Sequence, residues 1–246
     1  GWLAVQVSCN DIAANGAEPV GVLVTVLLAE QASEEDLRVL MEDVHRAASE
    51  LKIEVLGGHT EVTPGLPATI ISSTAVGKAP KARYVTSSGA RAGDALVLTK
   101  SAGLEGTAIL ATDFESNLRN VLKPEMLAKA QSFREEISVV KEGVTAAELG
   151  ATAMHDPTEG GVLGAIYEMA TAAGLGVEIQ ADAIPIREET AKICEIFHAD
   201  PLKLISSGAL LIACPDGEAR VEGLARYDIT STVIGRFVPI ASGRWV

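Results

Sequence analysis

Basic residues, cysteines and long apolar runs are scarce in this chain of 246 residues, and each scarcity excludes a class of protein. With 20 lysines and arginines against 33 aspartates and glutamates, the formal net charge is −13, so the chain lacks the basic surface that nucleic-acid binding requires. Three scattered cysteines indicate a reducing, cytoplasmic compartment and not a disulfide framework. No uninterrupted apolar run reaches the roughly 18 residues of a membrane-spanning helix, so we expect no membrane partner.

The residues that are present predict a soluble globular protein. A hydrophobic content of 48% is enough for one large domain or two smaller ones. Because the protein is acidic, we expect it to handle an anionic ligand through a bound cation, and Mg²⁺ is the natural candidate where carboxylates gather. The chain begins with Gly1 inside a predicted helix, so we expect that a further N-terminal segment precedes it.

Alternating helix and strand patterns predict a two-domain α/β (α+β) fold. The first part contains helical patterns from Trp2 to Ala13 and from Ser33 to Leu51, and strand patterns at Val20–Leu28, Ile53–Leu56 and Thr69–Val76. The first strand is apolar on both faces and is predicted to be central. Because few helices are available to cover this sheet, we expect a homodimer that buries one of its faces. Lys78–Arg91 is polar and aperiodic, and we place the boundary between domains 1–78 and 92–246 there.

A dense polar segment follows the predicted strand Ile53–Leu56 and consists of Gly57, Gly58, His59, Thr60 and Glu61. A strand that halts at paired glycines predicts a turn whose backbone lies close to a ligand, because glycine has no Cβ and permits positive φ. The same residues are also compatible with a tight turn that carries polar side chains and binds nothing.

Two aspartates at the ends of other elements favour a site. Asp11 lies near the end of the first predicted helix, where the helix dipole disfavours an anion. Asp156 follows the predicted strand Ala151–Met154, and Thr158 is the predicted N-cap of the next helix. Each aspartate also has a local explanation, which is surface exposure for Asp11 and amide capping for Asp156. Our hypothesis is that the two carboxylates converge at the domain junction and share a cation.

Three ordered motifs resemble a known family: Asn10-Asp11-Ile12-Ala13-Ala14-Asn15-Gly16-Ala17-Glu18-Pro19, Gly57-Gly58-His59-Thr60-Glu61 and Met154-His155-Asp156-Pro157-Thr158-Glu159-Gly160-Gly161. Together they resemble the aminoimidazole ribonucleotide (AIR) synthetase-related superfamily over nearly the whole chain. The branch they resemble most is that of hydrogenase expression/formation protein E, where a downstream Ile-Pro, here Ile184-Pro185, is usual.

The resemblance implies an N-terminal domain that forms a barrel with a second subunit, a C-terminal α/β domain, and ATP with Mg²⁺ bound at their junction. Relatives phosphorylate an oxygen or activate an amide carbonyl of a small-molecule substrate. Asp11 and Asp156 match metal-binding acids of the family, and Gly57–Thr60 match the segment that approaches the nucleotide. His59 stands where several relatives have Asp or Glu, so Glu61 is the candidate metal ligand in that segment.

Two features of the resemblance are not matched. Relatives carry a glycine-rich N-terminal segment, and the hydrogenase-maturation enzyme ends in a reactive cysteine, whereas this chain ends Arg244-Trp245-Val246. We therefore expect a relative of that enzyme and not the enzyme itself. An ATP-dependent enzyme is the first hypothesis, a nucleotide-binding maturation or regulatory partner without turnover is the second, and a structural or metal-only dimer is the third.

Overall fold

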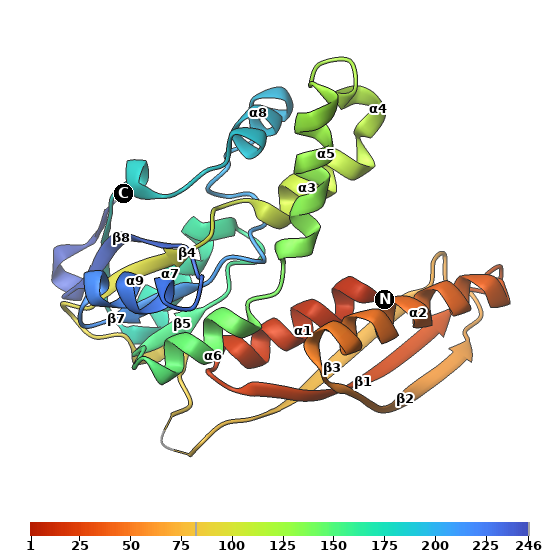
Figure 1. The fold of residues 1–246 in the computed structure, drawn as a ribbon, viewed down its shortest axis with the longest axis horizontal. Coiled ribbons are helices and arrows are strands. Elements are labelled where there is room, and N and C mark those ends of the chain that lie inside the picture. The colour runs from red at the N-terminus through yellow and green to blue at the C-terminus, as the bar shows by residue number, and fades with distance from the viewer. Residues whose placement is uncertain (82, 246) are drawn as a thin grey trace.

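The computed structural model describes residues 1–81 and 83–245, and its N-terminal part is a three-stranded sheet with two helices on one face (Figure 1). Its elements are α1 (Trp2–Ala14), β1 (Glu18–Leu28), α2 (Glu34–Leu51), β2 (Glu54–Val62) and β3 (Ile70–Lys78). β1 lies between the other two strands, parallel to β2 and antiparallel to β3. The prediction of a central strand at Val20–Leu28 is therefore confirmed.

The local sequence explains where α2 begins and what it covers. The Ser33 hydroxyl accepts a hydrogen bond from the Asp36 amide, and the Asp36 carboxylate accepts one from the Ser33 amide, which forms a capping box. Val44 and Ala48 on the apolar face of α2 are buried in one cluster with Cys9 of α1 and the inner side chains of β1. The predicted amphipathic helix is confirmed.

The opposite face of this sheet is exposed. Leu23, Ile70 and Val76 are 42%, 49% and 41% exposed, whereas Val22 and Val26 on the helix-covered face are fully buried. The three strands form an open sheet within the described residues of one chain. A barrel therefore requires strands from a second subunit and stays a prediction.

The predicted turn at Gly57-Gly58 is wrong, because β2 runs through both glycines as an extended strand. Leu56 is skipped in the pairing, since Val22 pairs with Val55 and the next residue of β1 pairs with Gly57. The two glycines have φ of 152° and 151°, a conformation that side chains disfavour, and a Cβ at Gly58 would lie 1.7 Å from the carbonyl oxygen of β1. The glycines thus permit a β-bulge and close strand pairing, and they do not reverse the chain.

The C-terminal part is a six-stranded sheet with helices around it. Its elements are β4 (Ala95–Thr99), α3 (Leu104–Asp113), α4 (Glu115–Leu118), α5 (Pro124–Ser132), α6 (Val140–Glu148), β5 (Ala153–His155), α7 (Gly161–Ala173), β6 (Gly176–Ile179), α8 (Glu188–Phe197), β7 (Leu211–Cys214), α9 (Gly217–Ala225), β8 (Ser231–Val238) and β9 (Arg244–Trp245). The strand order is β5-β7-β4-β8-β6-β9, and among the strands that the structure describes in this sheet only the β6–β9 pair is parallel. The fold is therefore mixed α+β with two parts, which confirms the predicted fold class, although the directions of the strands were not encoded in the strand periodicity.

A helical lobe stands beside this sheet in Figure 1 and contains α3, α4, α5 and α8. Its small core is formed by Ala111, Leu118, Leu127 and Ile193. None of the described helices combines the length and the apolar character needed to cross a bilayer. Ala82, inside the predicted boundary segment, and Val246 lie outside the described residues, and the boundary at Lys78–Arg91 stays a prediction.

α1 belongs to the N-terminal sheet and is also fixed to the C-terminal part. The fully buried Asn10 donates from Nδ2 to the carbonyl of Ile137 and accepts at Oδ1 from the amide of Val139, both at 2.8 Å. α6 approaches α1 so closely that a Cβ at Gly143 would lie 2.2 Å from the carbonyl oxygen of Ala13. The helix that carries Asp11 is therefore held rigidly at the junction.

Candidate functional site

The structure brings Asp11 and Asp156 close enough for their charges to interact, and we call these two residues the aspartate pair. Asp11 lies in the last turn of α1 and is exposed, whereas Asp156 directly follows β5 and is only 6% exposed. The charge on Asp156 helps to raise the pKa of Asp11, so the two carboxylates lie within range of each other's charge. Residues far apart in the sequence thus meet at the junction of the two sheets.

Both carboxyls of the pair have a pKa above the usual value for aspartate. Loss of solvent is the main cause for each, and the nearby His155 partly opposes it. The His155 ring is held by Glu168, with 2.8 Å between Nε2 and Oε2. The buried Cys9 thiol has its pKa raised to about 11, by burial and by the charge of Asp11, so it stays protonated and is no nucleophile. A divalent cation would relieve the repulsion between the two carboxylates.

The loop between β5 and α7 is shaped by glycine and not by a threonine cap. The prediction that Thr158 caps the helix is wrong, because the N-cap is Gly160 and no side chain caps α7. The Thr158 carbonyl instead accepts the Gly161 amide at 3.0 Å and closes a turn. A Cβ at Gly161, whose φ is 63°, would lie 2.6 Å from the carbonyl oxygen of Leu202. Two successive glycines let this loop pack against the chain near Leu202 while it presents Asp156.

The predicted nucleotide-binding segment Gly57–Glu61 lies elsewhere, on the exposed edge strand β2. His59 and Glu61 contact each other, with 3.3 Å between Nε2 and Oε2, and Thr63 donates to Glu61 at 3.2 Å. The charges that perturb Asp11 come from Asp156 and His155 and not from Glu61. Among the described contacts of a single chain, none joins this segment to the aspartate pair, and its ligand role stays a prediction.

The carboxylates of one chain can supply only part of a metal ion's ligands. Within residues 1–81 and 83–245, no three His, Cys, Asp or Glu side chains lie close enough to hold a metal, so Asp11, Asp156 and Glu61 do not form one cluster in a single chain. Proteins often bind Mg²⁺ through only one or two carboxylates, and water and phosphate oxygens complete its shell. The aspartate pair fits that mode of binding.

Sequence comparison finds relatives named for hydrogenase maturation. The chain is 30% identical over 223 residues to a putative hydrogenase expression/formation protein of Methanocaldococcus jannaschii, a match that covers 89% of this chain and 63% of the relative. It is 28% identical over 221 residues to the carbamoyl dehydratase HypE of Cupriavidus necator, covering 89% and 61%. The chain thus spans somewhat less than two thirds of the length of these relatives.

Solved structures share the fold. Escherichia coli HypE, a hydrogenase maturation protein, superposes with a TM-score of 0.83 at 25% identity and covers 97% of this chain and 73% of its own. HypE in complex with ATP gives 0.79 at 22% identity, covering 98% and 71%. Thiamine monophosphate kinase from Aquifex aeolicus gives 0.79 at 23%, covering 100% and 79%.

Two family models divide the chain between them. The N-terminal domain of AIR synthase related proteins matches residues 1–79, and the C-terminal domain matches residues 91–244. The second match alone covers more than half of the chain. The chain therefore belongs to the AIR synthase-related protein family, in the branch that contains the hydrogenase expression/formation protein E relatives.

Proposed function

We propose that this protein is an ATP- and Mg²⁺-dependent enzyme that phosphorylates or activates an oxygen of a small-molecule substrate. The observation that carries the proposal is the convergence of the aspartate pair at the junction, where each carboxyl has a raised pKa. Nothing in local structure requires a carboxylate at both positions. In this proposal Asp11 and Asp156 hold Mg²⁺, and bound Mg²⁺ supplies charge neutralisation for phosphate oxygens.

The relatives support the choice of an enzyme over a regulatory partner without turnover. One relative is named a carbamoyl dehydratase, and one structure of the same fold contains ATP. Because the chain spans only part of the length of its relatives, their activity and substrate are proposals for this chain, and a cytoplasmic location is likewise a proposal. The role of Gly57–Thr60 in nucleotide binding, and of Glu61 as a metal ligand, is proposed on the resemblance alone.

We also propose that the protein acts as a homodimer through the exposed face of the β1–β3 sheet. Leu23, Ile70 and Val76 provide apolar contact area on this face, and a monomer would leave them in water. Light scattering of the full-length protein should report twice the chain mass at micromolar concentration. A Leu23→Glu substitution should favour the monomer, whereas the exposed Val39→Glu on α2 should not.

The site is tested by isothermal calorimetry of the full-length protein with Mg²⁺ and a non-hydrolysable ATP analogue. Asp156→Asn should weaken nucleotide binding by about 1–3 kcal/mol, the scale of a lost charge-assisted contact. Asp182→Asn, at an exposed position of the same part of the chain, is the matched control and should bind like the wild type. ATP turnover, measured alongside, separates an enzyme from a nucleotide-binding partner. Equal affinity in both variants would refute the proposed metal site.

A further inference from the structure

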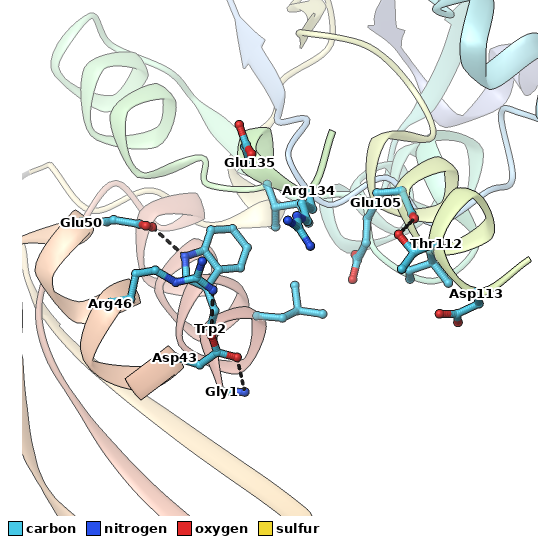
Figure 2. Close-up of a pocket in the computed structure, with 14 residues that line it drawn as sticks. Gly1, Trp2, Asp43, Arg46, Glu50, Glu105, Thr112, Asp113, Arg134 and Glu135 are labelled. Carbon is cyan, nitrogen blue, oxygen red and sulfur yellow. Dashed lines mark hydrogen bonds and ion pairs between the residues drawn. The ribbon is translucent and has the colours of Figure 1, made fainter. Parts of the chain in front are cut away.

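Two cavities away from the aspartate pair differ in how their buried charges are met. The first, of about 580 Å³, lies between α1 and α3 (Figure 2). Its Arg46 lies 2.7 Å from Asp43, and the indole N–H of Trp2 donates to Glu50 at 2.6 Å. Oε2 of Glu105 has no partner among the described residues, but this oxygen is enclosed by protein. The first cavity therefore offers a ligand no buried charge that it could reach.

The second cavity has a volume of about 530 Å³ and lies between the end of α6 and the helix α9. We call it the α6–α9 pocket. Its lining is charged at Asp216, Arg220, Glu222 and Arg226 and apolar at Leu149 and Pro215. The aspartate pair does not line it.

Arg220 is the unusual group of this pocket. Among the residues that the structure describes it is the only lysine or arginine that is buried, with 9% of its surface exposed. Its Nε is enclosed and has no hydrogen-bond partner in the described part of the chain. A Cβ at Gly150 would lie 3.9 Å from Nη2 of Arg220 and would meet no other atom within 4 Å outside the adjoining residues. Because Gly150 is itself exposed, the space beside Nη2 is open, and the guanidinium presents this nitrogen to the pocket.

The described residues supply no anion to balance this guanidinium. None of their carboxylates forms an ion pair or a hydrogen bond with Arg220. The nearby Cys214 thiol stays neutral, because burial raises its pKa more than Arg220 lowers it. Asp94 and Asp216 also act on Cys214, but Asp94 accepts a hydrogen bond from Thr152 at 2.6 Å and Asp216 caps α9.

The end of α6 compensates the charge only in part. Gly150 lies two residues beyond the last residue of α6, so Arg220 is near the negative end of that helix dipole. No carbonyl of the described residues accepts a hydrogen bond from the guanidinium, however. A buried charge without a partner is costly, and an oxyanion that accepts from Nη2 would remove this cost.

The other lining residues indicate the charge and the shape of that anion. Asp216 and Glu222 match the two arginines of the pocket in number, so the lining is neutral as a whole. A neutral lining favours a monoanion over the dianion of phosphate, whose second charge would face the two acids. Leu149 and Pro215 provide apolar surface for a short chain.

We propose that the α6–α9 pocket binds a small monocarboxylate with a short apolar chain, whose carboxylate accepts a hydrogen bond from Nη2 of Arg220. Arg226, which is exposed, attracts the same carboxylate from the rim, and Leu149 contacts the apolar chain. This site is separate from the proposed nucleotide site and does not depend on it.

The test uses the full-length protein and three probes, n-butyrate, 1-butanol and inorganic phosphate, with binding followed by NMR. Butyrate should bind about tenfold or more above butanol, because only the carboxylate forms a charge-assisted hydrogen bond with a guanidinium. Phosphate should bind more weakly than butyrate. Arg220→Gln should remove the preference for butyrate over butanol. Arg119→Gln, at an exposed arginine of the helical lobe, is the control and should change the butyrate affinity by less than about twofold.

Circular dichroism establishes that each variant is folded before binding is measured. If Arg220→Gln does not fold, Ala219→Glu and Ala219→Gln serve instead, because Ala219 is an exposed residue of the same pocket in the first turn of α9. The glutamate should weaken butyrate binding at least about threefold relative to the glutamine, since it places a like charge beside the ligand.

Equal binding of butyrate and butanol to the wild type would overturn the proposal. So would a butyrate preference that persists in Arg220→Gln, phosphate binding that is tighter than butyrate binding, or equal butyrate affinity in the two Ala219 variants.

Discussion

Replacement of Asn10 by alanine should show how strongly the two parts of the chain depend on one buried side chain. The amide of Asn10 is completely buried and makes two hydrogen bonds of 2.8 Å, one with the carbonyl of Ile137 and one with the amide of Val139. Asn10→Ala leaves both backbone groups without partners. A buried polar group without its partner costs about 1–3 kcal/mol, so the free energy of unfolding should fall by roughly 2–5 kcal/mol.

Urea unfolding monitored by circular dichroism measures this loss. Asn15→Ala is the matched control, because Asn15 lies at the end of the same helix and donates to the carbonyl of Asp11 at 2.7 Å from an exposed position. The control should lose no more than about 0.5–1 kcal/mol. If Asn10→Ala loses no more than the control, Asn10 is not what fixes α1 to the C-terminal part.

Three further predictions concern single residues. Lys100 Nζ lies 2.9 Å from the buried carboxylate of Glu142. Lys100→Met leaves that carboxylate without its counter-charge, so the free energy of unfolding should fall by about 3–5 kcal/mol. A loss below about 1 kcal/mol would contradict this prediction. Gly58→Ala should lower the melting temperature far more than Gly57→Ala, since a Cβ at Gly58 meets a backbone oxygen at 1.7 Å and one at Gly57 meets its nearest atom at 3.8 Å. Burial raises the pKa of Asp156 in the folded chain, so its ionisation lowers the free energy of unfolding as pH rises from the unfolded pKa through the folded pKa. Without Mg²⁺, Asp156→Asn should therefore have a melting temperature at or above that of the wild type at neutral pH and equal to it in acid. A melting temperature below the wild type at neutral pH would show a structural role for the carboxylate.

The sequence predicted those elements whose signals are local. The helical stripe of α2 and its capping box are contained in consecutive residues, and so is the β-branched run of β1. The convergence of Asp11 and Asp156 was predicted from the ends of two elements and from the family resemblance, and the structure brings the pair together. Its role as a metal site stays a proposal.

Features that depend on distant contacts were not predictable in the same way. Gly58 resembles a turn residue in the sequence, and only the approach of the β1 backbone explains why it lies inside a strand. Thr158 resembles an N-cap, but Gly160 and Gly161 delay the start of α7. The role of Asn10 was missed, although an asparagine beside Cys9 on the apolar face of α1 was a usable signal.

The raised pKa values of Asp11 and Asp156 indicate that their charges oppose folding at neutral pH when no cation is bound, and this cost is itself an argument for their function. Asp156 is almost fully buried and Asp11 has lost part of its solvent, and the charge of Asp156 also raises the pKa of Asp11. α1 cannot move away to relieve the repulsion, because Asn10 and the close contact with Gly143 hold it against the C-terminal part. A fold optimised for stability alone would place an amide at position 156. Asp156→Asn should therefore raise stability and weaken Mg²⁺-dependent nucleotide binding together, and a variant that lost stability while keeping its affinity would show that the carboxylate serves the fold.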